Sequence, residues 1–188
     1  MDTDRRPPDR HGHDGRDHPL EPADAGSIAR TGDDVIALTT WVVVCFGAGI
    51  LGSFATPKAA VEWYPSLVKP WFTPPGTVFA PIWTVLYLMM AVAVWRVGRA
   101  GAADAARRAA VGVFAVQLAL NMGWSWAFFA GRSPGLALAV ILVLLDCVVL
   151  VYWRFSRIDE LAGRLILPYL GWVGFAALLN LAIVLANR

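Results

Sequence analysis

The sequence predicts an all-α fold: an integral membrane bundle of five transmembrane helices, with a long proline-rich loop between the first two helices. Hydrophobic residues make up 57% of the 188 residues, and charged residues only 16%. Five apolar runs each have about the 20 residues that a helix needs to cross a bilayer: 35–54, 79–97, 109–130, 135–153 and 165–185. The rest of the chain has too little polar surface to cover five such helices in water, so a membrane bundle is expected.

The first 34 residues differ in composition from the rest, and we predict two regions: a disordered polar tail over 1–34 and a transmembrane domain over 35–188. The tail holds nine acidic residues, five arginines and all three histidines, but no aromatic residue. Such a segment cannot bury enough apolar surface to offset its ordering entropy. It also lacks the apolar core of a secretory signal.

The connection between the first two runs, residues 56–76, is the only long one. Its prolines, at positions 57, 65, 70, 74 and 75, restrict the backbone. Long loops in compact bundles are usually functional, and aromatic rings suit the boundary between water and lipid. We therefore predict that this loop covers a ligand pocket.

The distribution of basic residues predicts an orientation. With five spans, the two termini lie on opposite sides of the membrane. Counted from Arg30 onward, the amino-terminal side carries eight Lys or Arg residues and the other side four. The positive-inside rule then predicts a cytoplasmic N-terminus, in what we expect to be a bacterial cell membrane.

One face of the second span carries flat or soft side chains at spacings of four, four and three: Phe79, Trp83, Tyr87 and Met90. Ordinary helix packing with an interfacial aromatic belt is an alternative explanation of this pattern. A belt does not explain Trp83 and Tyr87, because both lie deeper in the span than a belt residue would.

The third span has two opposite faces. Small residues recur every four positions on one face: Ala115, Ala119, Gly123, Ala127 and Gly131. Such a face allows close packing, either inside the bundle or in a homodimer. The other face carries polar and aromatic residues: Gln117, Asn121, Trp124 and Phe128. The two amides are costly against lipid, so we expect them to point inward to a partner or a ligand.

The fifth span aligns large and small residues on one stripe: Trp172, Ala176, Leu179 and Ile183, with Asn180 adjacent. Ala176, one turn below Trp172, would leave room for a flat molecule beside the indole; a packed core is an equal alternative. Pro168 is expected in the first turn of this span, where a missing N–H costs little.

Asp146 lies near the middle of the fourth span, where a carboxylate costs about 2.5–3.5 kcal/mol. A functional role and a hydrogen-bonded carboxylate that joins helices are both open interpretations.

Several site types lack the residues they require. No histidine follows residue 18, so a haem in the bundle would have no histidine ligand. The sequence shows no zinc cluster, no phosphate-binding loop and no Ser/His/Asp set. A net charge of +2 without a basic stripe argues against nucleic acid as a partner. We expect no metal, no obligatory cofactor and no conventional catalysis, and we expect Cys45 and Cys147 to be free thiols.

Four strings, in this order, resemble the TspO/MBR family of tryptophan-rich sensory proteins and translocator proteins: WYPSLVKPWFTPPG, APIWTVLY, QLALNMGWSWAFF and PYLGWVGFAALLN. The resemblance covers residues 35–187. It implies a membrane receptor or sensor, commonly a homodimer, that binds porphyrins such as protoporphyrin IX and haem and that acts in tetrapyrrole metabolism or stress responses. A transporter of porphyrins or other amphipathic solutes, and a light- and oxygen-dependent porphyrin-degrading enzyme, are the alternatives.

Carried over position by position, the resemblance implies a ligand site, and we add Gln117 to it from the polar face of the third span. The predicted site is then Tyr64, Phe79, Ala80, Trp83, Tyr87, Gln117, Asn121, Trp124, Ala127, Trp172, Ala176 and Leu179. If the photo-oxidative activity exists, Trp83 and Trp172 would be its catalytic residues. Homodimer packing would use the small face: Ala115, Ala119, Gly123 and Ala127.

The sequence departs from the family pattern at two places. The loop reads Pro-Pro-Gly-Thr over 74–77, so the tryptophan expected at this corner is absent and Trp71 is the nearest replacement. The stretch 181–188 has no tyrosine for the Tyr–Arg cholesterol motif of animal members. Cholesterol is therefore not expected as the native ligand.

Overall fold

The computed structural model describes residues 23–188, and five of its helices are long and apolar enough to cross a membrane. These are α1 (Ala23–Ser53), α3 (Phe79–Arg99), α4 (Asp104–Ser125), α5 (Pro134–Ile158) and α6 (Glu160–Ala186). Among the described residues there is no strand. The predicted class, a helical integral membrane protein with five spans, is confirmed.

The first helix begins earlier than the apolar run. It starts at Ala23, so residues 23–34 are helical where the sequence led us to expect disorder. Adding residues to an existing helix costs little compared with nucleating one, which explains this extension from the apolar segment. The remainder of the predicted tail, residues 1–22, lies outside the described residues. The chain divides into two units between Asp34 and Val35, so the described residues 23–34 belong to a different unit from residues 35–188.

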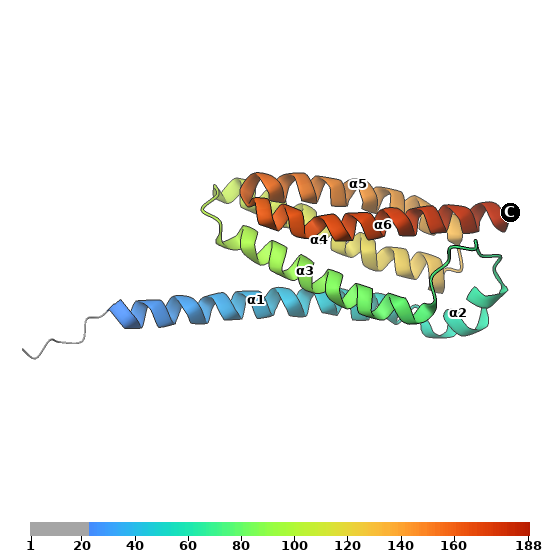
Figure 1. The fold of residues 1–188 in the computed structure, drawn as a ribbon, viewed down its shortest axis with the longest axis horizontal. Coiled ribbons are helices and arrows are strands. Elements are labelled where there is room, and N and C mark those ends of the chain that lie inside the picture. The colour runs from blue at the N-terminus through green and yellow to red at the C-terminus, as the bar shows by residue number, and fades with distance from the viewer. Residues whose placement is uncertain (1–22) are drawn as a thin grey trace, which may run out of the picture. The chain divides into compact units, whose positions relative to one another are not determined.

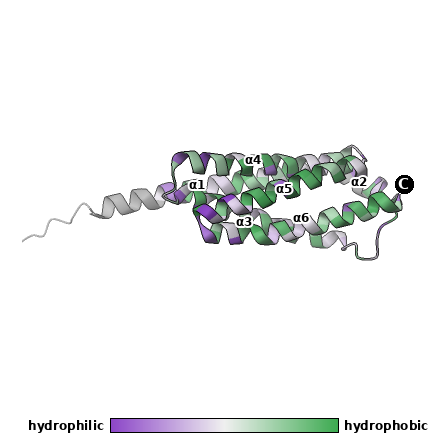
Figure 2. Ribbon diagram, turned by 90° about the horizontal axis from the view of Figure 1, so that it is seen from above, coloured by the Kyte–Doolittle hydropathy of each residue, from purple (hydrophilic) through white to green (hydrophobic). Residues whose placement is uncertain are grey.

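Helices α3 to α6 pack around a common core (Figure 1). The most extensive helix–helix interface is the one between α5 and α6, which run side by side. Helix α4 packs on α5, and α3 packs on α6. At Gly163 of α6, an added Cβ would lie 2.0 Å from the Ser156 hydroxyl oxygen of α5, so only glycine permits this close approach. Figure 2 shows hydrophobic residues along the middle of the helices, as a membrane-embedded surface requires.

The junction between α5 and α6 is tighter than predicted. Only Asp159 separates the two helices, whereas the sequence suggested a connection over 154–164. The Asp159 side chain accepts a hydrogen bond from the Ala162 N–H at 2.7 Å, which caps α6. Because α6 begins at Glu160, Pro168 lies inside the helix and not in its first turn, so that prediction was wrong.

The membrane segment of α1 contacts α3 and α4 through aromatic rings and one indole hydrogen bond. Phe46 lies 5.9 Å from Tyr87 of α3, and Trp41 lies 6.1 Å from Phe114 of α4. Just after α4, the Trp126 indole donates to the Leu51 carbonyl at 3.1 Å. The first part of the small face is not packed in the bundle core: Ala115 and Ala119 of α4 are exposed beside a shallow groove next to α1. Its use in a homodimer stays a prediction.

The long connection is structured. It contains α2 (Pro57–Glu62) and two short 3-10 turns, η1 (Tyr64–Ser66) and η2 (Gly76–Val78). We call residues 57–78 the lid. The Lys69 ammonium group donates to three lid carbonyl groups at 2.9–3.2 Å, so the cation holds the η1 turn together.

One residue at the end of α6 fastens the lid to the bundle. The Asn187 side chain accepts from the Val68 N–H at 2.9 Å and donates to the Val68 carbonyl oxygen at 2.9 Å. Arg132, in a left-handed backbone conformation with φ of 47°, lies 3.6 Å from Glu62 of α2. The lid therefore lies at the end of the bundle where α6 finishes (Figure 1).

Asp146 is exposed on the outer face of α5, and it forms no hydrogen bond or ion pair with the residues that the structure describes. Between the described helices, therefore, Asp146 does not make the helix-joining hydrogen bond that was one of its two interpretations.

Candidate functional site

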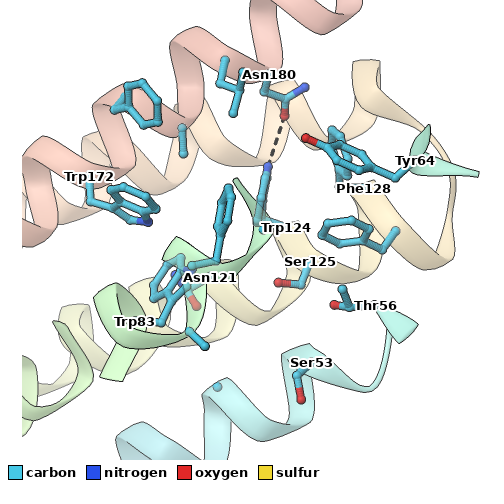
Figure 3. Close-up of a pocket in the computed structure, with 18 of the residues that line it drawn as sticks. Ser53, Thr56, Tyr64, Trp83, Asn121, Trp124, Ser125, Phe128, Trp172 and Asn180 are labelled. Atoms are coloured by element: carbon cyan, nitrogen blue, oxygen red, sulfur yellow. Dashed lines mark hydrogen bonds between the residues drawn. The ribbon is translucent and has the colours of Figure 1, made fainter. Parts of the chain in front are cut away.

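A cavity of about 540 Å³ lies under the lid, between α1, α3, α4 and α6 (Figure 3). Its volume is in the range of about 300–1,000 Å³ that is typical of small-molecule sites. The residues that line it are mostly aromatic or small: Gly49, Ser53, Thr56, Tyr64, Gly76, Phe79, Ala80, Trp83, Tyr87, Asn121, Trp124, Ser125, Phe128, Phe129, Trp172, Phe175, Ala176, Leu179, Asn180 and Ile183. None of these described residues is charged.

Three indole rings, one each from α3, α4 and α6, surround the cavity (Figure 3). Trp83 stacks on Tyr87, with ring centroids 5.3 Å apart and planes at 27°. Trp172 packs edge-on against Phe79 at 5.7 Å. Such pairs hold each ring in one orientation, so the walls of the cavity are formed in advance of any ligand.

The three indole N–H groups are not equivalent. That of Trp124 donates to the Asn180 side-chain oxygen at 3.1 Å, and the Asn180 amide in turn donates to the Pro134 carbonyl at 2.9 Å. Within residues 23–188, the indole N–H groups of Trp83 and Trp172 have no acceptor. These two donors can therefore serve a ligand, whereas Trp124 is used by the scaffold.

A π-helical turn brings two adjacent rings to the cavity. After α4 the chain continues as η3 (Trp126–Ala130), in which the Gly131 N–H donates to the Trp126 carbonyl five residues earlier, at 2.8 Å. This wider turn changes the angular spacing of its side chains, and both Phe128 and Phe129 line the cavity. Tyr64 of the lid packs on them at 6.2 and 6.1 Å, which joins the lid to η3.

Below the cavity lies a chain of buried polar contacts, which we call the polar layer: Tyr87, Met90, Gln117, Asn121 and Tyr169. The Tyr87 hydroxyl donates to Asn121 at 2.9 Å, and the Asn121 amide donates to the Tyr169 hydroxyl at 3.2 Å. Tyr169 donates to Gln117 at 2.9 Å, and the Gln117 amide contacts the Met90 sulfur at 3.8 Å. The amides thus point inward, as predicted, but their partners belong to the protein.

The cavity brings together ten of the twelve residues predicted for the ligand site: Tyr64, Phe79, Ala80, Trp83, Tyr87, Asn121, Trp124, Trp172, Ala176 and Leu179. The structure does not place Gln117 or Ala127 in its lining. Gln117 is buried in the polar layer, where its amide is already bonded. Ala127 lies in the π-turn and packs with the aromatic cluster around Phe128.

Residues from α1, and one residue just before the lid, were not predicted. Gly49, Ser53 and Thr56 line the cavity, together with Ser125 of α4. Ser53, Thr56 and Ser125 lie on the same side of it (Figure 3). The spacing of four between Gly49 and Ser53 is a sequence signal for a small face on α1, and it could have indicated this wall. Phe129 had no such signal, because its position depends on the π-turn.

The electrostatics of the cavity favour a largely apolar ligand with a few polar groups. Polar contacts are limited to hydroxyl, amide and indole groups, such as Ser125, Asn121 and Trp83. Burial raises the pKa of the Tyr64 phenol, so its hydroxyl keeps its proton. Among the described residues, no group of three or more His, Cys, Asp or Glu side chains is arranged to hold a metal ion.

Comparison with known proteins identifies relatives over most of the chain. A tryptophan-rich protein TspO from Chlorobaculum tepidum is 39% identical over 153 residues, covering 81% of this chain and 97% of its own. A tryptophan-rich sensory protein from Cereibacter sphaeroides is 36% identical, with 75% and 85% covered, and the human translocator protein is 32% identical, with 69% and 78% covered. Residues 41–185 match the TspO/MBR family, and this integral membrane protein therefore belongs to that family.

Proposed function

We propose that this protein is a membrane receptor or sensor that binds porphyrins, such as protoporphyrin IX or haem, in the cavity under the lid. The observation that carries the proposal is the set of three indoles around an uncharged cavity. Two of these indoles have N–H donors without an acceptor among residues 23–188. A porphyrin has a flat aromatic ring and carboxylate side chains, and these match the ring faces and the donors of such a site. One relative is named a tryptophan-rich sensory protein, which agrees with a sensory role.

Binding would depend most on Trp83 and Trp172. Contacts with aromatic rings contribute about 0.5–1.5 kcal/mol each beyond simple burial. The loss of both rings should therefore weaken binding by about 5- to 150-fold, since 1.4 kcal/mol corresponds to a factor of ten.

The experiment is a titration of the purified protein in detergent with protoporphyrin IX, followed by the Soret absorbance of the porphyrin itself. The double variant Trp83→Leu/Trp172→Leu is compared with Trp153→Leu, which changes an exposed tryptophan outside the cavity. We expect weak binding in the double variant and wild-type binding in the control. Equal affinity in all three proteins would refute this site.

Photo-oxidative degradation of the bound porphyrin is a second candidate. It is favoured by one observation: Trp83 contacts two other oxidisable rings, Tyr87 at 5.3 Å and Tyr169 at 6.3 Å. Light and oxygen should then bleach the Soret band faster with the protein than without it. At equal porphyrin occupancy, Trp83→Phe should slow this bleaching. Bleaching at the same rate in a protein-free sample would exclude the activity.

A homodimer through the small face of α4 is also proposed. Ala115 and Ala119 are exposed on a membrane-spanning helix, and an added Cβ at Gly123 would meet no atom within 4 Å. Replacing Ala119 by Cys should allow disulfide crosslinking of two copies in native membranes. A Cys at Leu142, on the outer face of α5, is the control that should not crosslink. A cytoplasmic N-terminus in a bacterial cell membrane stays a prediction.

A further inference from the structure

A short motif, Trp-Arg-x-x-Arg, occurs at the ends of two helices: Trp95, Arg96 and Arg99 in α3, and Trp153, Arg154 and Arg157 in α5. In each copy the last arginine lies over the tryptophan ring, with its Cζ atom 4.8 Å from the ring centroid in α3 and 3.7 Å in α5. Both copies belong to the end of the bundle opposite the lid. Figure 2 shows hydrophilic residues gathered at this end.

The middle arginine has different surroundings in the two copies. Arg96 makes a two-bond contact with Asp159, from Nε at 3.0 Å and from an Nη atom at 2.7 Å. The Nε atom of Arg154 is buried, but among the described residues it has no acceptor. Buried donors in folded proteins almost always have a partner, which is often water or an ion when no protein group is near. The Arg154 Nε–H group is therefore free to bind an anion, as the Arg96 Nε–H group binds the Asp159 carboxylate.

We propose that Arg154 and Arg157 bind the phosphate group of an anionic phospholipid at the outer surface of α5. The two residues are three apart on one helix, so they share a face. A planar guanidinium group forms two parallel hydrogen bonds with a carboxylate or a phosphate, as Arg96 does with Asp159.

A lipid is the source of the phosphate because the adjoining surface is apolar. Val149 and Leu150 lie one turn before this pair of arginines and are exposed, as is Val143 two turns further back. Trp153 is 48% exposed at the end of the span, where indoles lie at the headgroup level. A molecule with a phosphate next to long acyl chains matches both parts of this surface, whereas inorganic phosphate matches only the first.

The described carboxylates nearest to this pair in the sequence, Asp159, Glu160 and Asp146, do not neutralise the two arginines. Asp159 is engaged by Arg96, and Glu160 is paired with Arg164. Asp146 is eight residues before Arg154, which places it about 12 Å deeper along the helix. The positive charge of the pair is therefore available to an anion from the membrane.

The test is native mass spectrometry of the detergent-purified protein with added dioleoyl phosphatidylglycerol, and separately with the neutral phosphatidylcholine of the same chains. We expect the anionic lipid to bind more tightly. Arg154→Gln and Arg157→Gln should each weaken its binding about fivefold, the effect of one basic residue near an anionic lipid. Arg154→Lys, which keeps the charge but loses the buried Nε donor, should lose part of the affinity and also keeps the test decisive if Arg154→Gln fails to fold.

Arg164→Gln is the matched control, because it removes the same charge at the same end from a residue that is paired with Glu160. It should keep wild-type affinity for phosphatidylglycerol. Equal binding of both lipids, or equal loss in Arg164→Gln and Arg154→Gln, would overturn the proposal in favour of diffuse charge. Inorganic phosphate should not shift the thermal unfolding midpoint. A shift as large as that from phosphatidylglycerol would instead assign the site to a free anion.

Discussion

The cavity and the polar layer beneath it share the helices α3, α4 and α6, but they differ in whether their polar groups are hydrogen-bonded within the protein. In the polar layer, Tyr169 and the amides of Gln117 and Asn121 are bonded to one another and are almost fully buried. In the cavity above, the indole N–H groups of Trp83 and Trp172 have no acceptor in the described part of the chain. The polar groups of the scaffold are thus hydrogen-bonded to one another, whereas the candidate site keeps donors that a ligand can use.

This difference explains why polar residues on one helix face should not be assigned one role. Gln117 and Asn121 are one turn apart on α4, but only Asn121 reaches the cavity. Asn121 belongs to both regions, since it also bonds Tyr87 and Tyr169. The layer therefore forms the floor of the site, and its rigidity keeps the Tyr87–Trp83 stack in position.

The largest expected effect comes from breaking the layer at its centre with Tyr169→Phe. This change removes the hydroxyl that bonds both Asn121 and Gln117, so two buried amides lose a partner. We expect a loss of about 1–3 kcal/mol in the free energy of unfolding. Porphyrin affinity should fall less than in Trp83→Leu/Trp172→Leu, because Tyr169 does not line the cavity and acts on it only through its contacts with Asn121 and Trp83. Denaturant unfolding in detergent and a Soret titration measure the two quantities.

Tyr152→Phe is the control for this experiment, because the Tyr152 hydroxyl makes no hydrogen bond with the residues that the structure describes. Its stability should equal that of the wild type. A Tyr169→Phe variant that is as stable as Tyr152→Phe would show that the layer does not stabilise the fold.

The next largest effect should separate two tryptophans that the sequence does not distinguish. Trp124→Phe removes the donor to Asn180, so stability should fall by about 0.5–1.5 kcal/mol. Trp172→Phe removes no hydrogen bond within residues 23–188, so it should leave stability nearly unchanged and weaken porphyrin binding. The same two measurements apply. Identical behaviour of the two variants would contradict the distinction between scaffold and site.

The sequence predicted the five spans because length and hydropathy alone decide whether a helix can cross a membrane. It also predicted the wall residues on α3 and α6, such as Trp83, Trp172 and Ala176: helical periodicity aligns the residues of each helix on one face, and the family resemblance assigned them to a ligand site. Both features follow from the residue types within short stretches of the sequence.

The features that could not be predicted depend on contacts between distant segments. The inward direction of Gln117 was expected, but its partner Tyr169 lies on another helix, 52 positions away. Phe129 reaches the cavity through the π-turn, which forms where α4 meets the start of α5. The spacing of residues along the sequence could not indicate that Asp159 alone separates α5 from α6. The position of this junction depends on the ion pair between Asp159 and Arg96 of α3.

A smaller effect is expected at the attachment of the lid. Asn187→Ala removes both hydrogen bonds to Val68, so the lid should open more often. A net loss of about 1 kcal/mol corresponds to about fivefold faster porphyrin release, which stopped-flow displacement can measure. Asn187→Asp, which keeps the acceptor but not the donor, should give an intermediate rate. Unchanged release in Asn187→Ala would mean that the lid does not control access.

The smallest effect should come from a polar contact that water can replace. The hydrogen bond from Arg96 lowers the pKa of the Asp159 carboxyl group below its ordinary value of about 3.9. A carboxyl group whose pKa is lower in the folded than in the unfolded state stabilises the fold above its unfolded pKa. Its contribution is therefore present above about pH 4 and is lost as the pH falls through the lowered pKa.

Thermal unfolding from pH 6 down to pH 2 should show this loss in the wild type, and Asp159→Asn should lack that part of the acid dependence. Arg96→Gln should lack most of it too, because the arginine is the main cause of the lowered pKa. The Arg96 side chain is 34% exposed and that of Asp159 19%, so we expect less than about 1 kcal/mol. An acid effect in the wild type larger than the loss in Tyr169→Phe would mean that this pair at the membrane boundary, and not the buried polar layer, is the main polar support of the bundle.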